Sequence, residues 1–276
     1  MSIITLTSDY GLKDHFVGAL KGKIYSAYPE AVLVDISHQV DPFNISEASY
    51  ILNAATPNFP IGTVHIIGVD CERNRENEHI AIKWNDQYFI AADNGILSLL
   101  TQVVLAQKMV KINIHEFMLN GSSDMDVFIK VGIHLAKGGM LHEVGDEITT
   151  LKEVTEMQPF ASSDFKTIKG NVVYIDNFGN AITNISKKLF IEIANKRSFE
   201  ISTKNVKLKT ILDRYSDLGA KENAPIKNQE AKSLALFNEN GLLEIAVYKS
   251  NPDKFGSAHS LLGLNYRDVV TIEFNN

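Results

Sequence analysis

The first half of the chain alternates short apolar runs with segments whose apolar residues recur at helical spacing. Apolar, largely β-branched runs at 3–6, 31–36 and 63–70 predict buried strands, the last of them ending in a carboxylate. Between them, 16–28 and 46–56 predict helices, the second capped by Ser46 and ended by Pro57. The order strand, helix, strand, helix, strand predicts a three-layer α/β domain with a mainly parallel sheet.

The pattern then continues with a hairpin and two further helices. Strands are predicted at 79–83 and 87–91, with a turn at 84–86 between them. The turn signal A-D-N-G at 92–95 leads into a predicted helix over 96–104. A predicted strand at 109–114 precedes a helix over 126–136, which Gly138 and Gly139 end.

Between about residues 151 and 169 the apolar residues lose their regular spacing, which indicates a linker. After Gly170 the strong signals are all β, and a hairpin turn is predicted at 238–241. We therefore predict an N-terminal α/β domain over 1–155, a linker over 156–169 and a smaller all-β domain, sandwich or barrel, over 170–276.

Carboxylates follow the predicted strands at the positions where open α/β sheets bind ligands. Asp9 comes directly after the first strand, Asp70 ends the third, and Asp14 lies near the start of the first helix. Two interpretations of Asp9 and Asp14 stay open. They are a turn residue and a helix cap, or they are a pair that binds hydroxyls and an ammonium of a polar ligand.

Composition narrows the classes of function. The formal net charge of −6 argues against nucleic acid or an anionic membrane as the main partner, because both favour a basic surface. Cys71 is the only cysteine, so no internal disulfide forms. We find no charged-then-apolar leader and no apolar run long enough to span a bilayer, and we expect a cytoplasmic protein.

Familiar nucleotide and metal motifs are missing from the sequence. Neither G-x-x-x-x-G-K-[ST] nor G-x-G-x-x-G occurs, which argues against a nucleotide triphosphatase and an ordinary dinucleotide enzyme. We expect no metal and no cofactor, although the oxygen ligands of Asp9, Asp14 and Asp70 leave a magnesium site open as the alternative. Four isolated histidines are interpreted as structural, because zinc sites need clustered ligands: His38, His65, His79 and His134.

The stretch 174–184 gathers amide and carboxyl groups around one aromatic ring and one glycine. One interpretation is a polar turn anchored by Phe178. The other is a ligand ring stacked on Phe178, with Asp176 and Asn180 as its hydrogen-bond partners. Composition does not choose between them.

Motifs along nearly the whole chain resemble the S-adenosylmethionine hydroxide adenosyltransferase family, which is related to the fluorinating and chlorinating enzymes. Residues 7–22 resemble the opening T-D-F-G-x-x-D-x-[FY]-V-G-x-x-K-G, and 92–97 resemble P-D-N-G-x-L. The segments 126–128, 133–139 and 143–145 resemble G-R-D-x-F, A-x-H-L-A-x-G and E-x-G. Residues 175–184 resemble I-D-x-F-G-N-x-x-T-N, and 238–246 resemble N-S-x-G-x-L-x-I-A.

The resemblance implies an N-terminal α/β domain, a C-terminal β-barrel and a homotrimer that binds S-adenosylmethionine between neighbouring subunits. By resemblance, Asp9 holds the ribose hydroxyls, Asp14 holds the methionine ammonium, and Asn94 lies in a substrate-binding motif. The remaining substrate-binding residues implied are Phe43 as an aromatic wall, Asp176, Phe178 and Asn180 on the other side of the ligand, and the backbone near Tyr248 at the adenine edge.

The reaction implied is displacement at the ribose 5′ carbon, where the sulfonium leaves as a neutral thioether and needs no acid. Family hydrolases orient the attacking water with an Asp, an Arg and a His. Asp70 matches the Asp, whereas the Arg and His positions fall on Asn77 and Ser123. Arg73 or Arg75 is expected to replace the missing cation. Glu239 replaces a Ser in the loop at the methionine end.

The leading hypothesis is a hydrolase that converts S-adenosylmethionine to adenosine and methionine. The second is a protein that binds S-adenosylmethionine or adenosine without turnover, which the replacements at Asn77 and Ser123 favour. The third is an adenosyl transferase with a different nucleophile or a non-sulfonium substrate.

Overall fold

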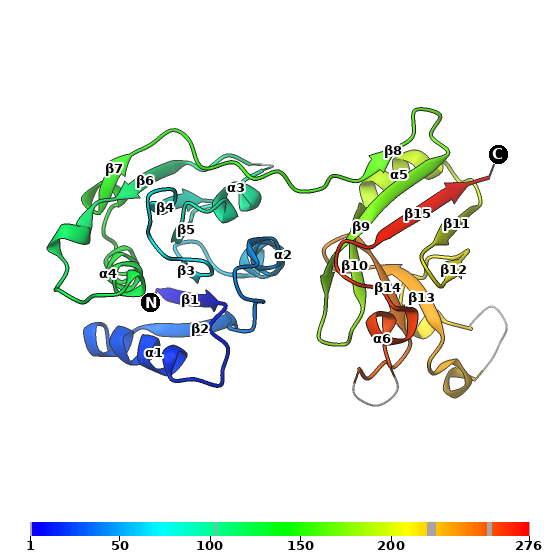
Figure 1. Ribbon diagram of the computed structural model, residues 1–276, viewed down its shortest axis with the longest axis horizontal. Helices are drawn as coiled ribbons and strands as arrows, with labels where there is room; N and C mark the ends of the chain where they lie inside the picture. Colours follow the sequence, from blue (N-terminus) through cyan, green and yellow to red (C-terminus); the bar gives the residue numbers. More distant parts are fainter. Residues whose placement is uncertain (1, 103, 220–224, 253–255, 276) are drawn as a thin grey trace. The chain divides into compact units, whose positions relative to one another are not determined.

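The computed structural model describes residues 2–102, 104–219, 225–252 and 256–275. The chain divides into two compact units, Met1–Glu156 and Met157–Asn276, and each is described by itself (Figure 1). The predicted linker stays a prediction. Part of its range, from Phe160 onward, contributes strands to the second unit.

The first unit is built on a seven-stranded sheet with the order β2-β1-β3-β5-β4-β6-β7. Strands β2, β1, β3 and β5 pair in parallel, and β4, β6 and β7 extend the sheet by antiparallel pairing. The strands are β1 (Ile3–Ser8), β2 (Val32–Ser37), β3 (Val64–Gly68), β4 (His79–Trp84), β5 (Gln87–Ala92), β6 (Lys108–Ile112) and β7 (Gly145–Glu147).

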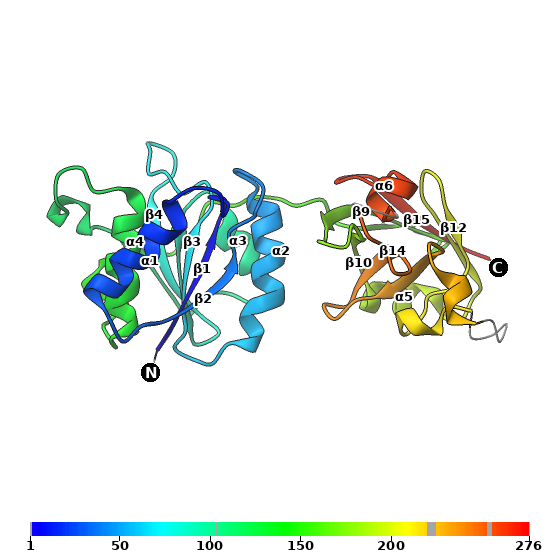
Figure 2. The ribbon, with the colours of Figure 1, turned by 90° about the horizontal axis from the view of Figure 1, so that it is seen from below.

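Helices cover both faces of this sheet, which confirms the predicted three-layer architecture. Helices α1 and α4 lie on one face, and α2 and α3 lie on the other (Figure 2). The helices are α1 (Phe16–Ala27), α2 (Ile45–Ala55), α3 (Ile96–Leu100) and α4 (Asp124–Ala136), with short 3₁₀ turns η1 (Thr56–Asn58), η2 (Ile114–Phe117) and η3 (Leu141–Glu143).

The two faces of the sheet carry separate cores because side chains alternate along each strand. On β3, Ile66 packs in the core that contains Phe128 of α4, while its neighbour Ile67 packs with Leu52 of α2. Helix α4 lies close to the sheet at Gly132, where an added Cβ would come within 2.8 Å of Ile66 Cδ1. A buried sheet between two helical layers is thus fixed by alternating apolar positions.

The predicted cap of α2 is wrong. The N-cap is Asn44, whose side chain accepts a hydrogen bond from the Glu47 backbone N–H at 3.1 Å. Asn is among the best capping residues, and starting the helix there satisfies a backbone donor that Ser46 would leave unpaired.

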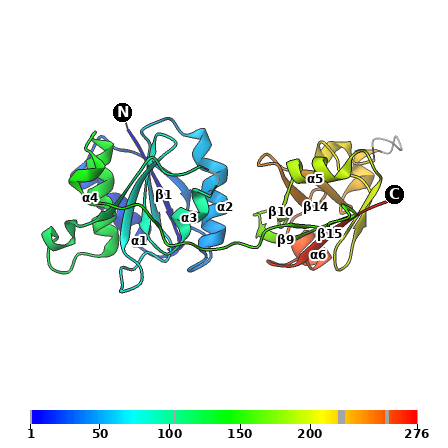
Figure 3. The same ribbon diagram turned by 90° about the horizontal axis from the view of Figure 1, so that it is seen from above.

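The second unit is all-β in its framework, as predicted. Its strands form a nearly closed antiparallel sheet with the order β12-β11-β15-β9-β10-β14-β13, and β8 pairs with β9. Helices α5 and α6 lie on opposite sides of these strands (Figure 3). Its elements are β8 (Phe160–Ala161), β9 (Thr167–Ile175), β10 (Ala181–Ser186), α5 (Lys187–Ala194), β11 (Phe199–Ser202), β12 (Lys207–Leu208), η4 (Tyr215–Asp217), η6 (Ile226–Gln229), β13 (Ser233–Phe237), β14 (Leu242–Val247), α6 (Ala258–Leu262) and β15 (Val269–Phe274).

No helix within the described residues is both long enough and apolar enough to cross a membrane.

One core histidine makes the stability of the first unit depend on pH. His65 on β3 is fully buried, with its ring nitrogens 2.7 Å from Thr5 Oγ1 and 3.2 Å from Gln87 Oε1. Burial lowers the pKa of His65 to about 4. The folded protein therefore keeps His65 neutral where the unfolded chain, with a pKa near the ordinary value of about 6.5, already binds a proton.

We predict that this histidine contributes a loss of about 2 kcal/mol in the free energy of unfolding between pH 7 and pH 5. The stabilisation is fully present above the unfolded pKa and is lost as the pH falls through it. Urea denaturation at pH 7 and pH 5 measures the decrease in the free energy of unfolding. In His65→Gln this decrease should be smaller by about 2 kcal/mol. In His142→Gln, at an exposed site, it should equal that of the parent. If the free energy of unfolding decreased equally in the parent and in His65→Gln, this account would be contradicted.

Candidate functional site

The site lies where the carboxyl ends of three neighbouring parallel strands meet. Strand β3 pairs with both β1 and β5 in parallel. Asp9 follows β1, Asp70 follows β3 and Asn94 follows β5. The sheet therefore brings these three predicted residues to one edge, where open α/β sheets bind ligands.

Asp9 ties the loops at this edge together. Its Oδ2 accepts hydrogen bonds from the backbone N–H of Phe43, at 3.0 Å, and of Asp70, at 3.3 Å. Its other oxygen, Oδ1, makes no hydrogen bond to any described residue. Asp9 thus acts as the turn residue that one interpretation predicted, while half of its carboxylate stays available to a ligand.

Both partners of Asp9 adopt left-handed backbone conformations. Phe43 has φ = 63° and Asp70 has φ = 45°. Such conformations are tolerated by Asp but cost a bulky residue about 1 kcal/mol or more. Phe43 is nevertheless 72 % exposed, so burial of its ring in the free chain does not compensate the strain. Strain of this kind clusters at ligand-binding sites.

Asn94 supports the Asp70 loop from within the protein. Its buried side-chain amide donates to the carbonyl oxygens of Val69 at 3.1 Å and Asp70 at 2.9 Å, and its oxygen accepts from the Ile96 N–H at 3.1 Å. Gly95 follows with φ = 106°, and a Cβ there would lie 2.1 Å from Val154 Cγ2. In this structure Asn94 holds its neighbours, and its predicted contact with substrate stays a prediction.

Asp14 is exposed in the turn before α1, and His15 occupies the N-cap position without a capping side-chain hydrogen bond. The capping interpretation of Asp14 is therefore not observed.

The predicted cations do not contact Asp70. Arg73 Nε donates to Glu78 Oε2 at 2.8 Å, and Glu78 also pairs with Lys111 at 3.0 Å. Arg75 lies exposed in the same loop. At the position of the family Arg, Asn77 Oδ1 accepts from Lys152 Nζ at 2.8 Å. Among the described residues, no group of three or more His, Cys, Asp or Glu side chains is arranged to hold a metal ion.

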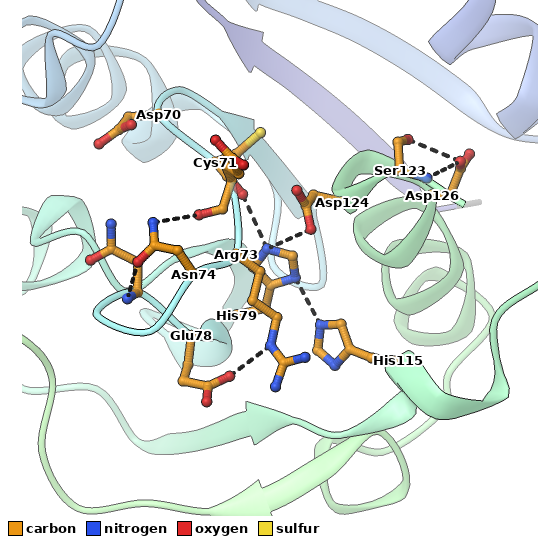
Figure 4. Close-up of polar contacts among 12 residues, drawn as sticks. Asp70, Cys71, Arg73, Asn74, Glu78, His79, His115, Ser123, Asp124 and Asp126 are labelled. Atoms are coloured by element: carbon orange, nitrogen blue, oxygen red, sulfur yellow. Dashed lines mark hydrogen bonds and ion pairs between the residues drawn. The ribbon is translucent and has the colours of Figure 1, made fainter. Parts of the chain in front are cut away.

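A polar cluster that the sequence did not reveal lies beside Asp9 and Asp70. His79, at the start of β4, is fully buried. Its Nε2 lies 3.1 Å from the Cys71 carbonyl oxygen and 3.5 Å from Asp124 Oδ1. Its Nδ1 lies 2.9 Å from His115 Nε2 (Figure 4). The Tyr10 hydroxyl lies 3.5 Å from Cys71 Sγ.

Burial keeps the cluster largely uncharged. It raises the pKa of Tyr10 well above its ordinary value and raises the pKa of the Cys71 thiol, with Asp9 and Asp124 acting in the same direction on both. It lowers the pKa of His79 to about 4 and that of His115 below its ordinary value. Because Asp9 and Asp124 both act on Tyr10 and Cys71, these side chains share one electrostatic environment.

A surface cleft of about 670 Å³ adjoins this cluster. It is lined by residues 73–75 of the loop before β4, and by residues 115, 116, 118–124 and 127, which include His115 and Asp124. Ser123, at the family His position, caps α4 together with Asp126, whose carboxylate accepts from the Ser123 N–H at 2.8 Å. Ser123 is therefore engaged in holding the helix.

A Ser-His-Asp arrangement elsewhere in the first unit is structural. Ser8 Oγ lies 2.7 Å from His38 Nδ1, and His38 Nε2 lies 3.2 Å from Asp35 Oδ1. Ser8 is only 1 % exposed, so no substrate reaches its hydroxyl. With the Gly11 N–H donating to the His38 carbonyl at 2.7 Å, this arrangement fixes the turn that carries Asp9.

The predicted residues of the second unit form a polar turn. Asp176 Oδ1 accepts from the backbone N–H groups of Phe178, at 2.9 Å, and Asn180, at 2.8 Å. The Asn180 amide donates to Asp176 Oδ2 at 2.9 Å and to the Tyr215 hydroxyl at 3.3 Å. The Tyr215 hydroxyl in turn donates to Glu244, whose pKa is raised by burial.

One buried atom of this turn has no hydrogen-bond partner in the described part of the chain. Asn180 is 4 % exposed, and its Oδ1 is buried without a hydrogen bond among the described residues. The Phe178 ring, two residues earlier in the sequence, is 61 % exposed. At Tyr248, the backbone N–H and carbonyl already bond to the backbone of Lys232 and Ala231. The turn therefore offers an acceptor and an aromatic face.

The strain at Phe43 yields a stability prediction. Phe43→Gly should raise the free energy of unfolding above that of Phe43→Ala by about 1 kcal/mol, because glycine adopts positive φ at no steric cost and alanine does not. Both variants remove the ring equally. Urea denaturation of the pair measures the difference, and equal stabilities would mean that the loop relaxes around residue 43.

Comparison with known proteins bears on this site. The profile described as SAM hydroxide adenosyltransferase N-terminal domain matches residues 4–145, and that of the C-terminal domain matches residues 170–271. A protein of Methanocaldococcus jannaschii named (R)-S-adenosyl-L-methionine hydrolase is 29 % identical over 288 residues, covering 99 % of this chain and 96 % of its own. A Thermus thermophilus protein of the same name is 25 % identical, with 96 % of both chains covered.

A solved structure agrees with these matches. The crystal structure of a conserved protein from Thermotoga maritima superposes with a TM-score of 0.82 at 28 % sequence identity, covering 98 % of this chain and 99 % of the other. The two profiles together span most of the sequence in the order that the motifs predicted. The chain belongs to the SAM hydroxide adenosyltransferase family.

Proposed function

We propose that this protein hydrolyses S-adenosylmethionine to adenosine and methionine by attack of water at the ribose 5′ carbon. The proposal rests on the Asp9 carboxylate at the carboxyl ends of the strands. Its Oδ2 accepts two hydrogen bonds from the backbone, and its Oδ1 accepts none from the described residues. Two backbone N–H groups orient the carboxylate through Oδ2, and Oδ1 is left to accept hydrogen bonds from the ribose hydroxyls. The relatives named (R)-S-adenosyl-L-methionine hydrolase support this choice of substrate.

The polar turn of the second unit suits the adenine end. An exocyclic amine donates hydrogen bonds, and the buried Asn180 Oδ1 is an acceptor without a partner among the described residues. The exposed Phe178 ring suits stacking on a purine. Asp14 is assigned the methionine ammonium, and Asp176 orients the turn.

We further propose a homotrimer in which the site is completed between neighbouring subunits, as the family resemblance implies. The two sets of binding residues lie on separate compact units, which is compatible with such sharing. Light scattering measures the assembly, and a monomer that still binds ligand would contradict it. The cytoplasmic location stays a prediction.

The main task of the protein in this reaction is to position the attacking water relative to the ribose 5′ carbon. The sulfonium leaves as a neutral thioether, so no acid is needed. The nucleophile must be held in line and partly stripped of bulk water. We assign Asp70 to orient this water, because it follows β3 beside Asp9 and its backbone N–H is tied to the Asp9 carboxylate.

A second candidate is a binding protein without turnover. Asn77 and Ser123 replace the family Arg and His, and each is engaged elsewhere, with Lys152 and with the cap of α4. The binding residues would then serve recognition alone.

Chromatography of products separates the two candidates. We predict that S-adenosylmethionine incubated with the protein yields adenosine and methionine in equal amounts. Asp70→Asn should lower turnover by about 10²-fold and change binding little, because Asn tolerates positive φ but lacks the charge. Asp9→Ala should mainly weaken binding, because the ribose hydroxyls lose their acceptor.

Tight binding without products in the parent would favour the second candidate. Full turnover in Asp70→Asn would make Asp70 a structural residue at the strand end. Absence of any melting shift with millimolar S-adenosylmethionine or adenosine would argue against both candidates, because a ligand bound only by the native state stabilises it.

A further inference from the structure

Two histidines and one carboxylate form a chain of polar contacts that the function proposed above leaves unused. The two histidines are hydrogen-bonded to each other, and the carboxylate lies within ion-pair distance of one of them. Asp124 Oδ1 lies 3.5 Å from His79 Nε2, and His79 Nδ1 lies 2.9 Å from His115 Nε2. The three residues come from α4, β4 and η2. Figure 4 shows the two imidazole rings side by side with the Asp124 carboxylate directed at His79.

The neighbouring groups determine which ring nitrogen of each histidine carries the proton. His79 Nε2 lies 3.1 Å from the Cys71 carbonyl oxygen, which only accepts, so Nε2 carries the proton. Burial keeps His79 neutral, so its Nδ1 is an acceptor and His115 Nε2 donates to it. The remaining nitrogen of His115, Nδ1, is therefore an unprotonated acceptor in neutral His115.

That acceptor is not used by any residue that the structure describes. His115 is half-buried, and its Nδ1 makes no hydrogen bond to any described residue. The ring lines the 670 Å³ cleft together with Arg73 and Asp124. A histidine that served packing alone would not need an oriented partner behind it, whereas a base needs both an open nitrogen and a group that sets its tautomer.

His79 connects this chain of contacts to the loop that carries Asp70. The carbonyl that orients His79 belongs to Cys71, the residue after Asp70. Asp124 and Asp9 both act electrostatically on Tyr10 and Cys71, so the carboxylate at the end of the chain shares its surroundings with the proposed ribose-binding carboxylate.

We propose that His115 is the general base that accepts the proton of the attacking water, and that His79 and Asp124 are positioning residues that hold it. The proposal rests on the hydrolysis proposed above. It assigns to His115 a role that the residues at the family Arg and His positions, Asn77 and Ser123, do not fill.

The step balances with the groups present. The water oxygen forms a bond to the 5′ carbon as the bond from that carbon to sulfur breaks. The electron pair of the broken bond stays on sulfur, which becomes the neutral thioether of methionine. The proton lost by water goes to His115 Nδ1, and the imidazolium then releases it to solvent through the open cleft.

The groups around His115 favour its unprotonated form, which a general base needs at neutral pH. Burial is the largest cause that lowers the pKa of His115, and Arg73 and Lys111 lower it further. Glu78 and Asp124 act in the opposite direction and would stabilise the imidazolium once formed. The charged groups that act on His115 are thus Arg73 and Glu78 on the loop before β4, Lys111 on β6 and Asp124 on α4.

The pH profile of His115→Ala tests the proposal. In the parent, kcat should fall on the acid side with a midpoint below about pH 6.5, as His115 becomes protonated. His115→Ala should lower kcat by about 10²-fold, leave KM within about twofold and abolish this acid limb. Added imidazole should restore part of the rate by taking the place of the missing base. His134→Gln, on α4 with its ring paired to Glu143, is the matched control and should behave as the parent.

Asp124→Asn provides a second readout if His115→Ala is poorly folded. Removing the negative charge lowers the pKa of His115, so the acid limb should shift to lower pH. A residue with a merely structural role would change the rate without moving this midpoint.

The outcomes separate the two proposals. If the parent produces no adenosine, the hydrolysis and the role of His115 both fail. If the parent hydrolyses S-adenosylmethionine and folded His115→Ala keeps its rate and acid limb, only the role of His115 is overturned. A loss of rate that imidazole does not relieve, together with an unmoved midpoint in Asp124→Asn, also overturns it.

Discussion

The organisation of this site depends on one carboxylate that accepts two backbone hydrogen bonds. Asp9 Oδ2 receives the N–H groups of Phe43 and Asp70, so the loops after β2 and β3 are held against the end of β1. Both donors lie at positive φ, which costs free energy that the hydrogen bonds to a charged acceptor offset. Asn94 secures the same loop from the other side through the carbonyls of Val69 and Asp70. The geometry of the binding edge is thus set before a ligand arrives.

The change of strand direction within the sheet explains how a second set of groups reaches this edge. Strands β1, β3 and β5 end here, and β4 runs antiparallel to β5, so it begins here with His79. Strand β6 runs antiparallel to β4 and ends here, which brings η2 and His115 close to His79. A purely parallel sheet would place the start of β4, and with it His79, at the opposite edge. The mixed sheet therefore combines the carboxylates proposed to bind the ligand with a hydrogen-bonded histidine pair.

Much of this architecture was predictable from the sequence, and the exceptions have physical causes. Apolar periodicity located the buried strands and helices, and the position of Asp9 and Asp70 after strands predicted that they meet. The histidine pair was not predictable, because His79 and His115 are 36 residues apart and meet only through the antiparallel register of β4 and β6. The support role of Asn94 and the unpartnered oxygen of Asn180 depend on side-chain directions within turns, which residue type alone does not specify.

The central claim is that water attacks the ribose 5′ carbon of S-adenosylmethionine, and isotope labelling tests it most directly. The protein is incubated with S-adenosylmethionine in water enriched in ¹⁸O, and the products are analysed by mass spectrometry. The account predicts one ¹⁸O atom in adenosine, in its 5′ hydroxyl, and none in methionine. Labelled homoserine with 5′-methylthioadenosine would place the attack on the methionine side chain, and unlabelled adenosine would exclude water as the nucleophile; either result would contradict the account.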